Sequence, residues 1–279
     1  MPRLSRNPVE ALARLGYGAR GVVYGLVGGL ALLAAIGSGG QTGGSRSALQ
    51  TLLAQPLGRF WLLLIALGLF GFCAWRVLEA LTDADRRGSD MKGWAVRGAH
   101  LVSGFIYAGL ALFAVNLALG RGSGSGEDQA ARDWTAWLLN QPFGRWLVGL
   151  AGLAVIGAGL GFVAKAWRGR VAERLSLPAD AQGWVCALGR MGFAARGVVF
   201  LLIGGFLGLA ALNASSSEAR GLGGALQALQ QQPYGWVLLA LTALGLFAFG
   251  LFGLVQARYR HIDAPDLEDA KAAVARAGS

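Results

Sequence analysis

Residues 13–36 read ARLGYGARGVVYGLVGGLALLAAI, in which two arginines precede an uncharged run from Gly21 to Ile36. A close copy is found at residues 189–212, GRMGFAARGVVFLLIGGFLGLAAL, and a weaker copy at residues 94–117, WAVRGAHLVSGFIYAGLALFAVNL. Each copy, as a helix, is long enough to cross a hydrocarbon core about 30 Å thick. The sequence therefore predicts a membrane protein built from an internal repeat.

Composition supports this class. The 279 residues are 54% hydrophobic and 14% charged, with a mean hydropathy of +0.50. Soluble domains carry about 25% charged residues, so this chain has too little charge to cover a water-exposed surface. The formal charge of +10 comes from basic residues that flank the apolar runs. This distribution is typical of membrane topology and argues against a nucleic-acid partner.

The chain predicts an all-α polytopic fold of six transmembrane helices, arranged as three tandem two-helix repeats with pseudo-threefold symmetry. The expected spans are residues 19–37, 58–80, 98–119, 144–165, 195–213 and 234–257. The expected units are residues 1–81, 94–168 and 188–260, followed by a cytoplasmic tail at 261–279. Each second helix follows a Gln-Pro pair, and proline suits the first turn of a helix. The pairs are Gln55-Pro56, Gln141-Pro142 and Gln232-Pro233.

Before each Gln-Pro pair, apolar residues recur at helical spacing among polar ones, at residues 47–54, 134–140 and 225–231. This pattern favours short helices lying on the outer membrane surface. A polar loop with incidental leucines remains the alternative.

The Lys and Arg distribution predicts the orientation. Nineteen of the 25 Lys and Arg residues lie on the side that holds both termini and two connecting loops. All nine tryptophans lie at or just beyond the ends of predicted spans. The Lys and Arg bias places the termini in the cytoplasm of a bacterial inner membrane, and the tryptophans support the predicted ends of the spans. The first apolar run recurs inside the chain, so we interpret it as an uncleaved span rather than a signal peptide.

The motifs at residues 16–24, GYGARGVVY, and 192–200, GFAARGVVF, resemble a bacterial membrane family known as a domain of unknown function, family 1206. The resemblance covers nearly the whole chain and implies three tandem two-helix units without an established activity. Unit two departs from the motif. Its residues 96–100, VRGAH, keep the Arg-Gly pair but lose the aromatic-glycine lead-in and the Val-Val pair.

The strongest candidates for a functional role are Arg20, Arg97 and Arg196, each followed by glycine and interpreted as equivalent positions of the three units. In one interpretation, each guanidinium reaches the inner headgroups and fixes the depth of its helix. In the other, pseudo-threefold packing gathers all three around a small anion or a lipid phosphate.

Glycines at small-xxx-small spacing predict close helix packing within the chain, with homo-oligomer contacts as the alternative. The pairs are Gly25/Gly29, Gly157/Gly161 and Gly204/Gly208. Glu79 is expected to form an ion pair with Arg76, one turn away.

No catalytic, metal-binding or cofactor-binding residues are expected. The two cysteines and two histidines are too few and too dispersed for a metal site, and no nucleophile–base set is evident. We therefore expect a non-enzymatic membrane protein with a structural, lipid-interacting or accessory role, whose partners are membrane lipids, including anionic headgroups, and a protein partner or second copy. The alternative is a transporter or channel for a small anion, with the arginines at its cytoplasmic mouth.

Overall fold

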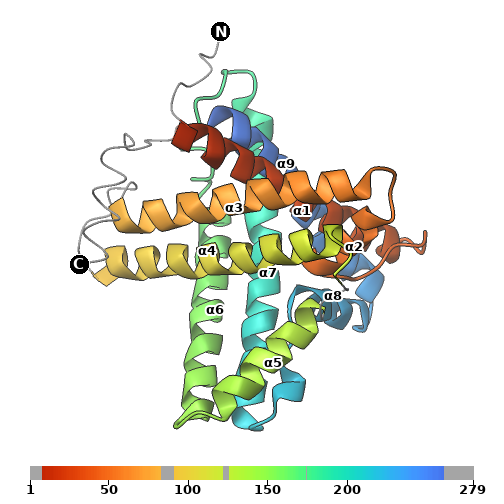
Figure 1. Ribbon diagram of the computed structural model, residues 1–279, viewed down its shortest axis with the longest axis vertical. Coiled ribbons are helices and arrows are strands. Elements are labelled where there is room, and N and C mark those ends of the chain that lie inside the picture. The colour runs from red at the N-terminus through yellow and green to blue at the C-terminus, as the bar shows by residue number, and fades with distance from the viewer. Residues whose placement is uncertain (1–7, 83–90, 122–125, 174, 261–279) are drawn as a thin grey trace.

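The computed structural model describes residues 8–82, 91–121, 126–173 and 175–260, and these ranges are almost entirely helical (Figure 1). The prediction for the tail at 261–279 lies outside the described residues. The helices are α1 (Pro8–Ala35), α2 (Ser45–Leu53), α3 (Gly58–Thr82), α4 (Met91–Ala118), α5 (Glu127–Leu139), α6 (Gly144–Trp167), α7 (Gln182–Leu212), α8 (Leu222–Gln230) and α9 (Gly235–Tyr259).

Six helices in the described ranges, α1, α3, α4, α6, α7 and α9, are long and apolar enough to cross a membrane. The chain is thus a multi-pass, all-α membrane protein, as predicted. The first helix of each unit begins earlier than predicted; α7, for example, begins at Gln182 rather than near residue 195. Hydropathy detects only the apolar part of a helix, whereas these helices continue as polar turns beyond it.

The short helices α2, α5 and α8 confirm that a helix precedes each Gln-Pro pair, and the polar-loop alternative is wrong. Their position on the outer membrane surface stays a prediction. Two acidic residues of α5 hold the other two short helices in place. The backbone N–H of Ser45, at the start of α2, donates to Glu127 Oε2 at 2.6 Å. The backbone N–H groups of Gly221 and Gly224, at the start of α8, donate to Asp128 Oδ1 at 2.7 and 3.0 Å. A carboxylate that accepts from these N–H groups stabilises the positive end of a helix.

The Gln-Pro pairs form turns rather than the first turn of the following helix. In unit one the backbone N–H of Gly58 donates to the carbonyl of Gln55 at 2.9 Å, and Leu57 adopts a left-handed φ of 57°. Phe143 and Tyr234 adopt the same conformation in the other units. A Cβ on Gly58 would collide with the carbonyl oxygens of the last turn of α2, so the motif needs glycine there. Proline therefore initiates a β-turn, in which it fixes φ at the second position.

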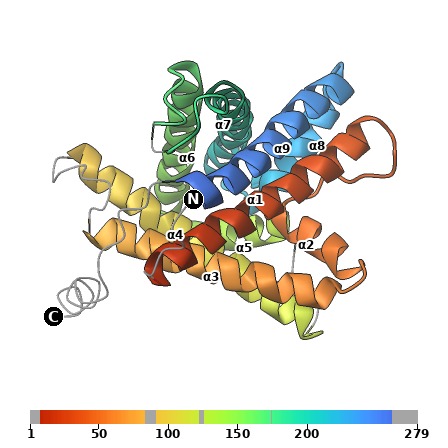
Figure 2. The ribbon, with the colours of Figure 1, turned by 90° about the horizontal axis from the view of Figure 1, so that it is seen from above.

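The six long helices pack in the order α4–α3–α1–α9–α7–α6 and form an open ring. The most extensive contacts join the first helix of one unit to the second helix of the preceding unit: α4 to α3, α7 to α6, and α1 to α9. Figure 1 shows α3 beside α4 and α6 beside α7, and Figure 2 shows α1 beside α9. The first and last long helices of the chain, α1 and α9, are thus neighbours in the middle of this order.

The predicted pseudo-threefold arrangement is not confirmed. Within units one and three, the two long helices pack on each other, as α1 with α3 and α7 with α9. In unit two, α4 and α6 do not form the corresponding packed pair, although both are fully described. The ends of the open ring are therefore the two helices of one unit.

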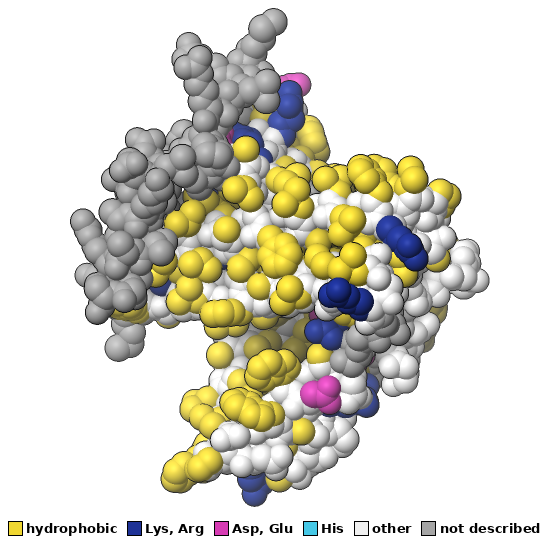
Figure 3. Space-filling view, in the orientation of Figure 1, with side chains coloured by type: hydrophobic (Ala, Val, Ile, Leu, Met, Phe, Trp, Pro, Cys, Tyr) yellow, Lys and Arg dark blue, Asp and Glu magenta, His cyan; other side chains and the backbone are white. Residues whose placement is uncertain are grey.

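The surface matches a protein surrounded by lipid. Apolar side chains cover the band formed by α3 and α4 (Figure 3). Eight of the nine tryptophans are at least 44% exposed, as expected for residues at a membrane interface. Trp75 is the exception: it is 3% exposed and packs in the core.

Candidate functional site

Each long contact between units ends in an arginine that binds the end of the neighbouring helix. Arg14 of α1 donates to the carbonyls of Ala257 and Arg258 at 3.0 and 2.6 Å. Arg97 of α4 donates to the carbonyl of Ala80 at 2.6 Å, and Arg190 of α7 donates to that of Ala166 at 3.2 Å. A cation at the C-terminal end of a helix satisfies carbonyls that lack partners and complements the helix dipole. These three arginines occupy equivalent positions in the three units.

This register corrects the sequence alignment of unit two. Arg97 is equivalent to Arg14 and Arg190, not to Arg20 and Arg196. The residue equivalent to Arg20 and Arg196 is Ser103, because SGFIY at 103–107 aligns with RGVVY at 20–24. The Arg-Gly pair in unit two lies two turns too early, and a sequence comparison that relied on this pair alone missed the shift.

Arg20 is buried, with 4% of its surface exposed. Its Nη2 donates to Gln256 Oε1 at 2.6 Å, and its guanidinium lies 5.1 Å from the ring centroids of Tyr17, Phe72 and Phe249. Its Nε is buried without a hydrogen-bond partner among the described residues. Arg20 therefore fixes the crossing of α1, α3 and α9 rather than reaching the membrane surface.

Arg196 is half-buried and makes equivalent contacts at the other side of α9. Its guanidinium lies 4.7 to 5.4 Å from four aromatic rings, those of Tyr24, Phe162, Phe200 and Phe249. Its Nε is also buried without a partner in the described ranges. Phe249 thus separates two arginines, and the structure brings Arg20 and Arg196 together while Arg97 remains apart.

The two guanidinium groups share a ring, so they lie at most about 10 Å apart. At that distance, two like charges repel by about 2 kcal/mol at an effective dielectric constant of 20. A desolvated cation–π contact contributes about 2 kcal/mol, and these rings are partly shared between cations. Burial of an ion costs several kcal/mol, and each unsatisfied Nε adds about 1–3 kcal/mol. The rings therefore offset only part of this cost. The arginine–aromatic centre, formed by Arg20, Arg196 and the rings around them, therefore favours an anion.

Glu79, a buried carboxylate at the end of the same helices, is already engaged. It is 2% exposed and accepts from Arg76 at 2.8 Å, which confirms the predicted pair, and from Arg260 at 3.3 Å. His100 Nδ1 lies 3.5 Å from Glu79 Oε2, the oxygen that accepts from Arg76. Arg260 also stacks on Tyr17 at 4.7 Å, and Arg76 stacks on Phe72 at 4.9 Å. The neighbourhood of Arg20 is thus rich in cations, and sequence reasoning missed this carboxylate as a buried residue because it lies at the end of a span.

The predicted packing glycines lie mostly beside the true close contacts. Of the six, only Gly204 would place a Cβ against a neighbouring helix, at 2.9 Å from the carbonyl oxygen of Gly152. A Cβ on any of the other five would meet open space. Two of these five are nevertheless close to another helix through their backbone: Gly250 approaches the backbone of Gly25, and Gly152 approaches that of Gly208. Glycines that do face the backbone of a neighbouring helix recur seven residues apart, and these are Gly21 and Gly28 on α1, Gly197 and Gly204 on α7, and Gly152 and Gly159 on α6.

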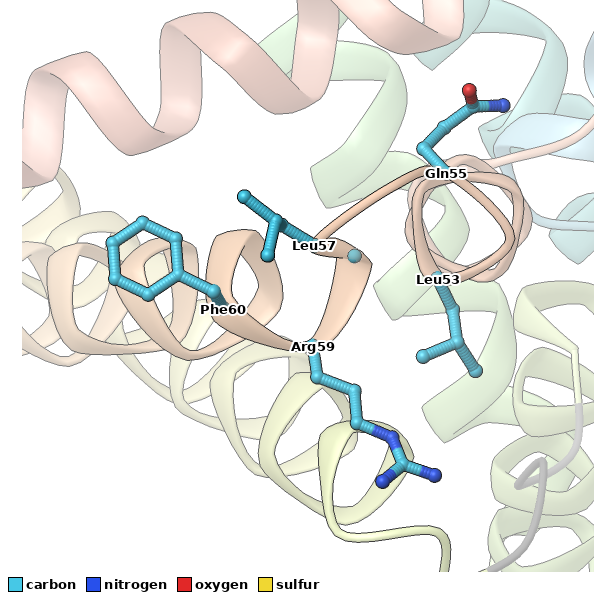
Figure 4. A pocket seen from close by; sticks show the side chains of 6 residues that line it. Leu53, Gln55, Leu57, Arg59 and Phe60 are labelled. Atoms are coloured by element: carbon cyan, nitrogen blue, oxygen red, sulfur yellow. The ribbon is translucent and has the colours of Figure 1, made fainter.

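Two further features do not form binding sites. An open hollow at the first Gln-Pro turn is lined by the end of α2 and the start of α3, where Arg59 and Phe60 point in different directions (Figure 4). It gathers no converging polar groups. Within the described ranges, no cluster of three or more His, Cys, Asp or Glu side chains has metal-binding geometry.

Comparisons with known proteins agree with the repeat. A family model described as Domain of Unknown Function (DUF1206) matches residues 15–83, 98–169 and 191–260. The three starting points, residues 15, 98 and 191, each follow the capping arginine of their unit and thus support the corrected register. The chain is similar to the "Uncharacterized protein YxxB" of Bacillus subtilis (strain 168), with 35% identity over 257 residues, 91% of this chain and 92% of the relative. No solved structure matches the chain.

Proposed function

Because this chain belongs to the DUF1206 family, a family of unknown function, we propose its function from the contacts of Arg20 and Arg196. The protein is a non-enzymatic protein of the bacterial cytoplasmic membrane that interacts with anionic lipids. One observation carries this proposal. Arg20 and Arg196 lie inside spans, on either side of Phe249, without a carboxylate partner among the described residues.

The chemistry of the centre supports binding rather than catalysis. Its charged groups are guanidinium groups, which stay protonated at physiological pH and act as neither bases nor nucleophiles. They match the oxygen geometry of phosphate. In a membrane, basic groups between helices at the cytoplasmic side are typical of sites for phospholipid headgroups. Transport of a small anion finds no support, because aromatic rings fill the space between the two arginines.

Lipid retention tests the proposal. The full chain is purified in a mild detergent from a bacterial membrane, and the bound lipids are measured by native mass spectrometry and lipid extraction. We expect retained anionic phospholipid to be enriched over zwitterionic phospholipid relative to the source membrane. A retained fraction with the composition of the bulk membrane would contradict the proposal.

The proposed orientation, with both termini in the cytoplasm, rests on the excess of Lys and Arg on that side. Single cysteines introduced at Leu57 and at Trp184, in a chain without Cys73 and Cys186, test it. In intact cells, a membrane-impermeant maleimide should label the cysteine at position 57 and spare the one at position 184. Labelling with the reverse preference would place the termini outside.

A further inference from the structure

Unit two lacks two side chains that fill the centre of the other units. In unit three, Phe249 of α9 is flanked by Arg196 of its own unit and by Arg20 of the next unit around the ring. The equivalent position on α3 is Phe72, and on α6 it is Ala158. The arginine equivalent to Arg20 is Ser103 on α4. Beside Arg196, unit two therefore has an alanine where the other units have a phenyl ring, and a hydroxyl where they have a guanidinium.

The helices that would close over this place, α4 and α6, do not form a packed pair. In units one and three, a Cβ on Gly16 or Gly192 would lie 2.7 Å from the Cα of Phe72 or Phe249, so the paired helices are in tight contact. The equivalent residues of unit two, Ala99 and Ala158, are both exposed. Figure 3 shows the surface hollowed between α4 and the region of α5 and α6.

The walls of this opening are small and apolar. The face of α4 that corresponds to the packed face of α1 presents Gly98, Ala99 and Val102, all exposed. The face of α6 that corresponds to the packed face of α3 presents exposed small residues at helical spacing, which are Ala154, Gly157, Ala158 and Gly161. A Cβ on Gly98, Gly157 or Gly161 would meet no other atom within 4 Å. These walls suit an acyl chain, because such a chain fills a smooth apolar groove without polar partners.

The charge at this opening selects the occupant. Arg196 stacks on Phe162 of α6, one turn beyond Ala158, and its buried Nε lacks a partner among the described residues. Lys165, one turn further on, lies over the ring of Phe193 at 4.2 Å. An apolar groove with cations at one end is complementary to an amphiphile with a negative headgroup.

We propose that the opening between α4 and α6 binds one anionic phospholipid, with its phosphate held by the Arg196 guanidinium and the Ser103 hydroxyl, and with an acyl chain against the small residues of both helices. This inference rests on the proposed function and assigns it to one site. It also explains why the ring of helices stays open in unit two: the lipid takes the place of the missing phenylalanine.

Variants of the full chain test the site, with the amount of retained anionic lipid as the readout in native mass spectrometry. Arg196→Gln removes the charge, Ser103→Ala removes the hydroxyl, and Ala158→Phe restores the ring of the other units. The matched controls are Arg145→Gln, an arginine at the opposite end of the α6–α7 pair, and Ala74→Phe, an exposed alanine of α3 outside the opening. We expect Arg196→Gln and Ala158→Phe to reduce retention about tenfold or more, the loss expected from a charge-assisted contact. Ser103→Ala should reduce it by less, and both controls should retain the wild-type level.

The outcomes separate the site from the function. Anionic lipid retained equally by wild type, Arg196→Gln and Ser103→Ala would overturn this site while the proposed function stands. A wild-type protein without a preference for anionic lipid would overturn both. Inorganic phosphate tests the other source: if phosphate alone raises the unfolding temperature in wild type but not in Arg196→Gln, and lipid retention shows no dependence on Arg196, the ligand is a free anion and the lipid assignment fails. Ser103→Ala carries the test if Ala158→Phe does not fold.

Discussion

The buried charged side chains of this membrane protein depend on a small number of partners. Glu79 holds Arg76, Arg260 and His100 at one end of the bundle, while Arg20 relies on one glutamine and three rings. Removing one member of a buried charge cluster leaves the others without compensation, and this costs more than the intact cluster contributes. The single carboxylate is therefore the residue on which its cationic neighbours depend.

Glu79→Gln tests this dependence. The neutral amide leaves two guanidinium groups near each other in a low dielectric, so we expect the free energy of unfolding to fall by about 3–5 kcal/mol. Thermal or denaturant unfolding in detergent, followed by circular dichroism, measures the loss. Glu173→Gln is the control, because its ion pair with Arg170 is exposed and contributes little. Equal stability of Glu79→Gln and wild type would show that the cluster is not held by this charge.

At the scale of helices, backbone proximity and capping determine the packing. The contacts between units place glycines of one helix against the backbone of the next: a Cβ added to Gly21 would lie 2.7 Å from the carbonyl oxygen of Gly250. The short helices are joined differently, through the carboxylates of Glu127 and Asp128 at the starts of α2 and α8. Close packing thus joins the long helices, and charge-assisted hydrogen bonds join the short helices.

Gly28 and Gly29 provide a neighbouring pair of test and control. A Cβ at Gly28 would collide with the backbone nitrogen of Phe247, whereas a Cβ at Gly29 meets no atom within 4 Å. We expect Gly28→Ala to lower the free energy of unfolding by about 1–3 kcal/mol through overpacking. Gly29→Ala should leave it unchanged or raise it by up to about 1 kcal/mol through helix propensity. Thermal unfolding in detergent compares them, and equal loss in both variants would contradict the packing.

The Glu127 carboxyl makes the joining of the short helices sensitive to pH. Burial raises the pKa of this carboxyl above its ordinary value. This effect outweighs the hydrogen bond from the Ser45 N–H, which lowers the pKa. The folded protein therefore binds this proton more tightly than the unfolded chain. The free energy of unfolding consequently falls as the pH rises through the interval between the unfolded value, about 4.3, and the raised folded value.

Glu127→Gln should remove this pH dependence. The amide oxygen still accepts from Ser45 without a buried charge, so at pH 7 we expect stability equal to or above that of wild type. Glu127→Ala loses the acceptor and should be less stable by about 1 kcal/mol. Unfolding temperatures measured between pH 4 and pH 8 compare the three proteins. A loss in Glu127→Gln at pH 7 as large as that in Glu127→Ala would show that the charge itself stabilises the cap.

At the scale of the whole molecule, the three units are equivalent in sequence plan but not in packing. The open ring of six helices ends at α4 and α6, both from unit two. Ser103 and Ala158 stand where the other units have arginine or phenylalanine. The side chains that close units one and three are thus absent in unit two, and its helices remain accessible from the lipid.

Cysteine cross-linking tests the opening in a chain without Cys73 and Cys186. The pair Val102→Cys and Ala154→Cys should not form a disulfide under mild oxidation, because the two helices are apart. The equivalent pair in unit one, Ala19→Cys and Gly68→Cys, should form one, since a Cβ on Gly68 would contact the Cβ of Ala19. Gel mobility and mass spectrometry report both. Efficient cross-linking of the unit-two pair would show that the opening closes.

The sequence by itself determined the membrane class, the three repeats, the six long helices and the short helices before each Gln-Pro turn. These features follow from local patterns, namely apolar length, helical periodicity and repeated motifs. The tertiary structure alone showed that Arg97 binds the end of α3, that Phe249 separates Arg20 from Arg196, and that unit two stays open. Each depends on which residues of distant segments meet, and the composition of a single segment does not contain this information. In unit two the arginine lies two turns earlier than Arg20 and Arg196 do in their units. This shift leaves the hydropathy of the segment unchanged, yet it places Arg97 at the end of a neighbouring helix instead of at the centre of the molecule.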